Sequence, residues 1–297
     1  MRGTIVKGIA GFYYVKSGET VYRCKARGIF KERGEKPAVG DRVEMEVIEG
    51  NDDSLITDIL PRRNSFLRPF VANVDCFAVV TAVAKPAPVL QTIDRFLVMA
   101  EKADTDVILC VNKCDLAGEG GKGQAGRAAE ALELIREIYS PIYPLLCLEQ
   151  DDEQGIEHLK EMIRGRTVAF AGASGVGKST IINRLLPQAA METGEISSKS
   201  QRGRHTTRHS QLFMVDGDEE TMVFDTPGFT SFDILRAEEE ELQFLYPEIG
   251  RLAGKCRYDN CRHLAEPDCA VKEALARGEI SESRYGSYKI QMEELRK

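Results

Sequence analysis

The chain has 297 residues, of which 42% are hydrophobic, and carries a formal net charge of -7. This length and composition suit a folded protein of two or three domains and argue against a disordered chain. No apolar run reaches the eighteen residues of a membrane-spanning helix, and the N-terminus lacks the apolar stretch of a signal peptide, so we expect a cytosolic protein without membrane contact.

The N-terminal region is predicted to be a small β-barrel of the oligonucleotide-binding (OB) type, spanning residues 1–68. Five short apolar stretches are separated by Gly, Asp, Asn and Pro, with little helical periodicity: 3–10, 12–16, 20–26, 41–48 and 54–60. Residues 1–70 hold thirteen Lys and Arg against ten Asp and Glu, in a chain that is acidic as a whole. This local positive charge favours contact with nucleic acid.

Aromatic residues are interleaved with the basic ones in this region: Phe12, Tyr13, Tyr14, Tyr22 and Phe30. Such a face suits stacking on RNA bases and contact with phosphates. The alternative for most of them individually is a place in the barrel core.

A linker is expected where Pro61-Arg62-Arg63 and Arg68-Pro69 occur, and the pattern then changes to alternating strands and helices. Strands are predicted at 74–83, 106–111, 167–171 and 221–224, and helices at 89–103, 125–140, 156–163 and 180–186. This alternation predicts an α/β domain over residues 69–230, with ligand loops at the carboxyl ends of parallel strands.

Residues 172–179 match the phosphate-binding pattern G-x-x-x-x-G-K-[ST], and lie between a predicted strand and a predicted helix as that motif requires. Backbone N–H groups of such a loop face the phosphates, Lys178 adds charge at the β and γ oxygens, and the Ser179 hydroxyl is a Mg²⁺ ligand. The predicted loop residues are Gly172, Ala173, Ser174, Gly175, Val176, Gly177, Lys178 and Ser179.

Asn112-Lys113-Cys114-Asp115 directly follows a predicted strand and has the form N-K-x-D. The Asp115 carboxylate can accept from N1–H and the exocyclic amine of guanine, a pair of donors that adenine lacks, which predicts GTP rather than ATP. Asn112 can donate to the other edge of the purine, and the stem of Lys113 can cover its face. Because this motif precedes the phosphate loop, the reverse of the usual order, we predict a circularly permuted GTPase domain.

A loop that supports the guanine oxygen is expected after a strand near 142–146. Many GTPases present Ser-Ala there, whereas this chain has Cys147-Leu148.

Two further segments are expected to sense the γ-phosphate. Asp225-Thr226-Pro227-Gly228 follows a strand, so that Asp225 can hold Mg²⁺ and Gly228 can offer its N–H to the γ-phosphate. In the switch at 199–209, Thr207 is favoured as the Mg²⁺ ligand, with Thr206 as the alternative. Phe229 stands where many GTPases have a water-orienting Gln, which leaves His205 as the candidate catalytic group; contact with RNA or packing within the switch are its alternatives.

Cys256, Cys261, His263 and Cys269 have the spacing C-x₄-C-x-H-x₅-C in a polar segment. Three thiolates and one imidazole suit a closed, structural Zn²⁺ site. We therefore predict a mostly helical zinc domain over residues 231–297, a tail too small and polar for a large core of its own. The other five cysteines are expected to be reduced and mostly buried.

With this permuted order, an N-terminal barrel and a Cys₃His cluster, the chain resembles the RsgA/YjeQ family of circularly permuted, ribosome small-subunit-dependent GTPases over essentially its whole length. The resemblance rests on residues 112–115, 172–180, 203–207 and 225–228 and on the four predicted zinc ligands. The resemblance adds Thr180 to the nucleotide site and implies a catalytic role for His205. The family switch commonly reads His-Thr-Thr-Thr, whereas Arg208 occupies the last place here, so the choice between Thr206 and Thr207 stays open.

The resemblance implies a GTPase that is activated by the 30S subunit, acts late in its maturation, contacts ribosomal RNA and leaves after hydrolysis. Its expected partners are GTP or GDP and the 30S subunit with its rRNA, its expected cofactors are Mg²⁺ with GTP and one structural Zn²⁺, and it is expected to be monomeric. The alternative is an RNA-binding scaffold that senses GTP and hydrolyses it incidentally. A GTP-dependent RNA-modifying enzyme lacks support, because no further catalytic constellation is visible.

Overall fold

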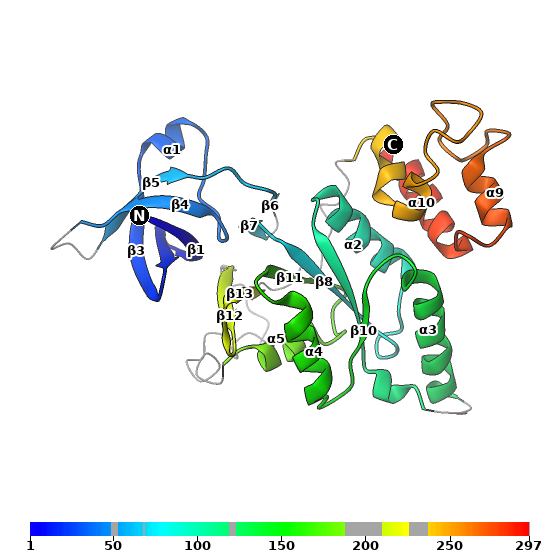
Figure 1. Cartoon of the computed structure of the whole chain (residues 1–297), viewed down its shortest axis with the longest axis horizontal. Coiled ribbons are helices and arrows are strands. Elements are labelled where there is room, and N and C mark those ends of the chain that lie inside the picture. Colours follow the sequence, from blue (N-terminus) through cyan, green and yellow to red (C-terminus); the bar gives the residue numbers. More distant parts are fainter. Residues whose placement is uncertain (49–52, 68, 119–122, 188–209, 226–236, 297) are drawn as a thin grey trace. The chain divides into compact units, whose positions relative to one another are not determined.

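A computed structural model describes residues 1–48, 53–67, 69–118, 123–187, 210–225 and 237–296 (Figure 1). Contacts divide the chain into two units. The N-terminal unit comprises 1–76, 156–170 and 178–229, and the C-terminal unit comprises 77–155, 171–177 and 230–297. The chain therefore passes several times from one unit to the other.

The N-terminal strands form a closed five-stranded barrel in the order β1-β2-β3-β5-β4, in which β1 also pairs with β4. Alternate side chains point inward along each strand, and those of Ile5, Val15, Cys24, Val43 and Ile56 are fully buried. The strands are β1 (Arg2–Ile9), β2 (Phe12–Ser17), β3 (Thr20–Ala26), β4 (Arg42–Glu46) and β5 (Ser54–Ile59), with a short helix α1 (Ile29–Glu32) between β3 and β4. The predicted barrel is confirmed.

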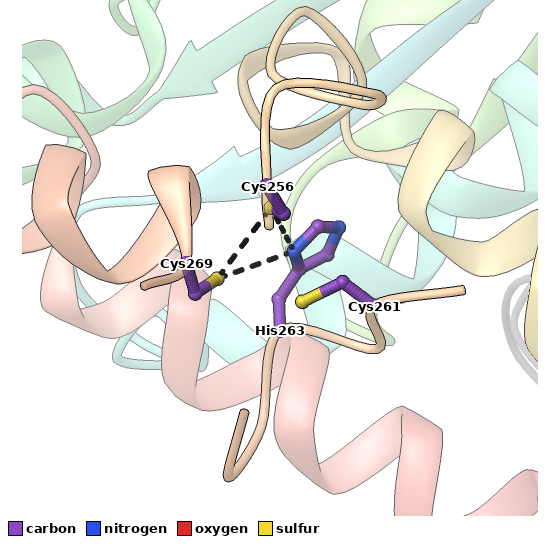
Figure 2. A group of neighbouring side chains, drawn as sticks. All are labelled: Cys256, Cys261, His263 and Cys269. Atoms are coloured by element: carbon purple, nitrogen blue, oxygen red, sulfur yellow. Dashed lines mark hydrogen bonds between the residues drawn. The ribbon is translucent and has the colours of Figure 1, made fainter. Parts of the chain in front are cut away.

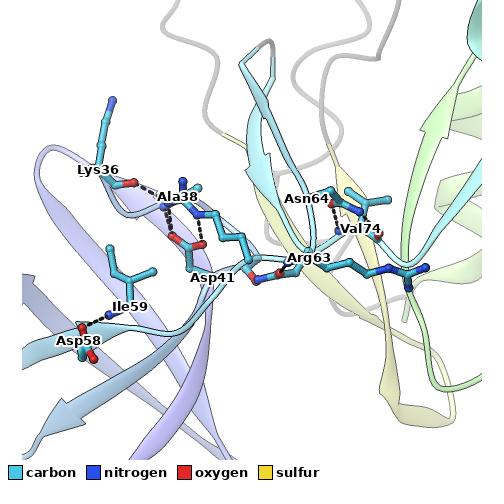
Figure 3. A network of polar contacts seen from close by, with 11 residues as sticks. Lys36, Ala38, Asp41, Asp58, Ile59, Arg63, Asn64 and Val74 are labelled. Atoms are coloured by element: carbon cyan, nitrogen blue, oxygen red, sulfur yellow. Dashed lines mark hydrogen bonds and ion pairs between the residues drawn. The ribbon is translucent and has the colours of Figure 1, made fainter. Parts of the chain in front are cut away.

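The segment expected to be a linker is instead a β-hairpin fastened to the barrel. Its strands are β6 (Ser65–Leu67) and β7 (Phe70–Ala72). Arg62 makes two hydrogen bonds of 2.7 and 2.8 Å to the buried carboxylate of Asp41, which is labelled in Figure 3, and Asn73 Nδ2 donates to Gly40 O at 2.9 Å. The linker prediction is wrong here: Asn64 and Val74 tie the two ends of the hairpin together, and the contacts that fasten it to the barrel come from residues more than twenty positions away.

Gly40 lies where the barrel meets this hairpin, with φ +95. A Cβ atom added there would lie 2.0 Å from Ala72 O, a backbone atom that cannot swing away. We expect Gly40→Ala to lower the free energy of unfolding by about 2 kcal/mol or more, measured by urea unfolding. Gly11→Ala is the matched control, since Gly11 has φ +85 and nothing within 4 Å of its added Cβ. Equal losses in the two variants would contradict the argument.

The remaining strands of the N-terminal unit form the phosphate-loop side of the α/β domain. The fully buried strand β11 (Thr167–Ala171) runs parallel to β13 (Asp218–Asp225), which pairs antiparallel with β12 (Gln211–Val215). The helices here are the larger part of α4 (Glu153–Ile163) and α5 (Lys178–Leu185). The sequence patterns predicted β11, α4, α5 and the end of β13, but not β12.

The C-terminal unit holds the part of the domain that carries the N-K-x-D tetrapeptide, together with the tail. Its strands have the order β10-β9-β8 and are β8 (Cys76–Ala82), β9 (Asp106–Asn112) and β10 (Leu145–Cys147). The associated helices are α2 (Leu90–Lys102), α3 (Gln124–Tyr139) and the 3₁₀ turn η1 (Cys114–Leu116). The strands and helices predicted between 74 and 140 are confirmed, with ends shifted by one or two residues. Within the described ranges, no helix combines the length and apolar character that crossing a membrane requires.

The tail has a larger apolar core than the sequence suggested. Leu242, Tyr246, Ile249, Tyr288 and Met292 are fully buried, and Val98 of α2 belongs to the same cluster. The tail's elements are α7 (Glu239–Leu242), η3 (Gln243–Leu245), α8 (Pro247–Gly250), α9 (Ala270–Ala276) and α10 (Glu282–Leu295). The expectation of a tail without a large core fails because its apolar residues lie on several short elements, where no single periodic pattern reveals them.

A buried charge cluster joins the tail to helix α2. The Arg284 guanidinium of α10 makes hydrogen bonds of 2.7 and 3.1 Å to Glu248 of α8 and one of 2.8 Å to Asp94 of α2. Tyr139 of α3 donates to the same Asp94 oxygen at 2.8 Å, and the Arg284 guanidinium lies 4.5 Å from the ring centre of Tyr246. Because Arg284 and Asp94 are fully buried, this cluster fixes the position of the tail against α2.

Candidate functional site

The loop predicted to bind guanine contacts the loop predicted to bind phosphate. Asn112, the last residue of β9, donates from Nδ2 to Val176 O at 2.8 Å. Lys113 has a left-handed backbone (φ 63) and donates from Nζ to Gly175 O at 2.9 Å and to Lys85 O. Two motifs about sixty residues apart in the chain are thus brought together within the C-terminal unit.

Glycines allow the phosphate loop to pack closely against neighbouring segments. At Gly177 (φ +105) an added Cβ would lie 2.1 Å from Asn112 Nδ2, and at Gly172 (φ +144) it would lie 2.2 Å from Val80 O. Gly175 also has a positive φ, which other residues rarely adopt. Gly177 thus lets the phosphate loop approach Asn112, and Gly172 lets it approach the backbone of strand β8.

The phosphate loop leads into α5, whose first residue is Lys178. Burial lowers the pKa of the Lys178 ammonium group. A phosphate group beside it would favour the charged form and offset this cost. Ser179 and Thr180 follow in the first turn with exposed side chains, where their hydroxyls are accessible to a ligand.

The segment after β10, where a guanine-supporting loop is predicted, lies beside the loop that carries Asn112 and Asp115. Leu148 N donates to Val111 O at 2.8 Å, and Cys114 N donates to Leu148 O at 3.0 Å. The exposed carboxylate of Asp115 accepts a hydrogen bond from Gln150 N at 3.1 Å. Asp115 is thereby oriented by backbone, a partner that the sequence motif does not reveal.

Asp225 ends β13, so its carboxylate lies at the end of a strand as predicted. The other residues assigned to γ-phosphate sensing and catalysis lie outside the described residues: His205, Thr206, Thr207 and Gly228.

The four predicted zinc ligands converge in the tail (Figure 2), with their ligand atoms within 4.8 Å of one another. His263 Nδ1 lies 3.5 Å from Cys256 Sγ and 3.4 Å from Cys269 Sγ, and the latter two sulfurs lie 3.8 Å apart. A tetrahedron with Zn–S of about 2.3 Å and Zn–N of about 2.0 Å has edges of about 3.8 and 3.5 Å. The cluster therefore has the size and the donor set of a closed zinc site.

Further residues orient the His263 ligand. Its Nε2 lies 3.0 Å from Gln243 Oε1, which leaves Nδ1 to face the sulfurs, and Gln243 is itself held by a 3.1 Å bond to Glu240 O. The Tyr285 hydroxyl donates to His263 O at 2.6 Å, and His263 adopts φ 60, a left-handed conformation uncommon in residues other than glycine. Sequence reasoning missed Gln243 and Tyr285, because neither is a metal ligand and neither follows a recognisable spacing.

The barrel carries cations over aromatic rings on strands β1 to β3. Arg23 and Lys25 lie 5.3 and 5.0 Å from the ring centre of Phe12, and Lys7 lies 6.0 Å from that of Tyr14. Tyr13 and Tyr22 are half-buried, whereas Phe30 is 2% exposed and belongs to the core. Four of the five aromatic residues proposed for RNA contact are thus accessible. Phe30 is instead part of the core, which was the alternative for these residues.

Comparisons with known proteins agree with this architecture. A family model described as RsgA GTPase matches residues 59–235, and one described as RsgA N-terminal domain matches residues 2–56. The chain is 44% identical to the small ribosomal subunit biogenesis GTPase RsgA of Alkaliphilus metalliredigens, covering 100% of this chain and 98% of that protein. It is 43% identical to the protein of the same name from Agathobacter rectalis, and this match also covers 100% of this chain and 98% of that protein.

The chain belongs to the RsgA GTPase family. Among solved structures, YjeQ from Thermotoga maritima superposes with a TM-score of 0.83 at 36% identity, covering 99% of this chain and 98% of that one. YloQ, described as a circularly permuted GTPase, superposes with a TM-score of 0.81 at 29% identity. The match covers 99% of this chain and 94% of that one. The predicted fold class is confirmed: an N-terminal barrel, a permuted α/β GTPase domain and a helical tail with a Cys₃His cluster. As a member of the RsgA GTPase family, the chain is a GTP hydrolase.

Proposed function

We propose that the protein is a ribosome-activated GTPase that acts late in maturation of the small ribosomal subunit. In this proposal it binds the 30S subunit and its rRNA in the GTP-bound form, in the cytoplasm, and is released by hydrolysis. The names of its relatives, small ribosomal subunit biogenesis GTPases, support this role.

The observation that carries the GTP site is the pair of hydrogen bonds from Asn112 and Lys113 to the phosphate loop. A nucleotide spans these two loops when its base and its phosphates are bound at once. Asp115 is then the acceptor that selects guanine, and Gly172–Gly177 with Lys178 and Thr180 form the phosphate cradle. Cys114, the variable position of the motif, contributes its backbone.

The magnesium and catalytic residues follow from the same arrangement. Ser179 and Asp225 are proposed to hold Mg²⁺, together with Thr207 or Thr206 from the switch, and Gly228 to contact the γ-phosphate. His205 is the proposed catalytic group. The chain is divided in this proposal into a barrel (1–68), the GTPase domain (69–230) and a zinc domain (231–297).

Ribosomal RNA is proposed to bind the cationic aromatic face of the barrel, where Phe12 and Tyr14 can stack on bases. Asp53 makes ion pairs of 2.5 and 2.8 Å with Arg23 and Lys25, so an RNA phosphate would compete with this carboxylate for both cations. The zinc ion is proposed to be structural, because its four ligands leave no open position.

The proposal predicts slow GTP turnover by the protein alone and a large increase with 30S subunits. Completion of another GTPase's site by a partner raises turnover by as much as about 10⁵-fold. His205→Ala should abolish the stimulation while GTP binding is retained, which single-turnover hydrolysis and filter binding would measure. His158→Ala is the matched control, because His158 lies exposed on α4.

Equal turnover with and without 30S subunits would contradict the proposal. If His205→Ala abolishes hydrolysis, yet maturation of the subunit and release of the protein continue, the GTP-sensing scaffold is the correct function.

A further inference from the structure

Two cysteines lie side by side behind the proposed guanine loop. Cys147 is the last residue of β10, and Cys114 is the first residue of η1, directly before Asp115. The backbone bonds between Cys114 N and Leu148 O (3.0 Å) and between Leu148 N and Val111 O (2.8 Å) hold the two segments together. The cysteine pair is therefore part of the framework that positions Asp115.

The two sulfur atoms have different surroundings. Cys114 is buried, and its thiol donates to Val111 O at 3.2 Å; Val111 is the residue of β9 that pairs with Cys147 of β10. Cys147 is half-buried, and its Sγ lies 3.3 Å from Nη2 of Arg136, which also pairs with Glu133 at 2.8 Å. The pair thus combines an accessible sulfur beside a cation with a second, buried sulfur, both of them next to Val111.

These contacts favour a thiolate at Cys147. The hydrogen bond from Cys114 and then the Arg136 guanidinium lower the pKa of Cys147 to about 6, against the effect of burial. The same contact, together with burial, raises the pKa of Cys114. At neutral pH Cys147 is the nucleophile and Cys114 is the thiol that can resolve its oxidation product.

We propose that Cys147 and Cys114 are a peroxide-sensitive thiol pair whose oxidation to a disulfide weakens guanine-nucleotide binding. Nothing in the GTPase reaction requires these two sulfurs. In a reducing compartment such a disulfide is transient, which suits a sensor rather than a structural bond.

The chemistry balances with hydrogen peroxide as the oxidant. The Cys147 thiolate attacks one peroxide oxygen, an S–O bond forms, the O–O bond breaks, and the departing hydroxide takes a proton to become water. The Cys114 sulfur then attacks the sulfenic sulfur of Cys147, the S–S bond forms, and the S–O bond breaks. The Cys114 proton leaves with that hydroxide as a second water, so two thiols and one peroxide give one disulfide and two waters.

The effect on nucleotide binding rests on the proposed guanine site. A disulfide needs an S–S distance of about 2.0 Å, so forming it takes the Cys114 sulfur away from Val111 O, the backbone acceptor it contacts at 3.2 Å. Loss of this contact loosens the start of the η1 turn, which also carries Asp115, the proposed guanine acceptor. By linkage, bound GDP should in turn slow the oxidation.

The first experiment exposes zinc-loaded full-length protein to hydrogen peroxide, blocks remaining thiols with N-ethylmaleimide and maps disulfides by peptide mass spectrometry. We expect a Cys114–Cys147 cross-link that dithiothreitol removes. The cross-link should be absent in Cys147→Ser, should form more slowly in Arg136→Gln and should be retained in Cys24→Ser, a buried thiol of the barrel. If the cross-link is absent from the oxidised wild type, the proposal is wrong.

The second experiment measures the affinity for a fluorescent GDP analogue before oxidation, after oxidation and after reduction. We expect a reversible loss of between about 5- and 150-fold, the usual range for coupled sites, and no change on peroxide treatment of Cys147→Ser. If the cross-linked protein binds GDP with unchanged affinity, the proposed effect of the disulfide on nucleotide binding is wrong. Failure of the reduced protein to bind GDP would instead refute the proposed guanine site and leave the thiol chemistry standing.

Discussion

Replacing Cys269 with serine is expected to abolish stoichiometric zinc binding and to unfold the tail. Cys269 Sγ lies 3.4 Å from His263 Nδ1 and 3.8 Å from Cys256 Sγ, so its loss opens the tetrahedron at one corner, and a serine hydroxyl is a poor ligand for this metal. Zinc binding supplies about 10 to 16 kcal/mol in small zinc-dependent folds. Losing most of that energy is comparable to the whole stability of a typical folded domain, about 5 to 15 kcal/mol, so the apolar core of the tail should not keep it folded alone.

The unfolding should be visible in two independent measurements. The zinc content should fall from one ion per chain to far less, and amide hydrogen exchange should become fast in α9 and α10, which pack in the same cluster as Cys261 and Cys269. Cys76→Ser, which removes a buried thiol outside the cluster, is the control for loss of a cysteine and should keep its zinc. A Cys269→Ser protein with full zinc and unchanged exchange would show that the four residues are not a metal site.

Replacing Arg284 with methionine is expected to destabilise the C-terminal unit by about 3 to 5 kcal/mol, because it leaves the carboxylates of Asp94 and Glu248 buried without their cation. Chemical unfolding monitored by tyrosine fluorescence and circular dichroism would measure the loss. Arg277→Gln is the matched control: its ion pair with Glu279 is exposed on both sides, so little change is expected.

A triple variant separates the effect of charge from the effect of shape. Combining Arg284→Met with Asp94→Asn and Glu248→Gln removes all three charges while keeping an acceptor for the Tyr139 hydroxyl. It should be more stable than Arg284→Met alone, because no buried carboxylate is left unpaired. If the triple variant is the less stable of the two, the cost comes from lost packing rather than from the charges.

Much of the candidate site could be predicted because its signals are local. The glycines and Lys178 of the phosphate loop, the N-K-x-D tetrapeptide and the four zinc ligands each occupy a short stretch, where residue type and spacing are set by the ligand. The barrel strands were predicted for a similar reason, since alternation and turn residues act within a few positions. Pro and Arg around the hairpin at 65–72 predict a linker, whereas hydrogen bonds to Asp41 and Gly40, distant in the sequence, fasten it to the barrel.

The sequence alone determined the order of the motifs, the guanine preference they imply, the permuted domain and the donor set of the metal site. Only the tertiary structure decided which side chains support these sites: Val176 and Gly175 as partners of the guanine loop, Gln243 as partner of His263, and Cys147 as partner of Cys114. It also brought Asp94 and Arg284 together across 190 positions of the chain. The physical reason is that a ligand fixes the spacing of the residues it touches directly, while supporting contacts need only proximity, which the folded chain can achieve at any sequence separation.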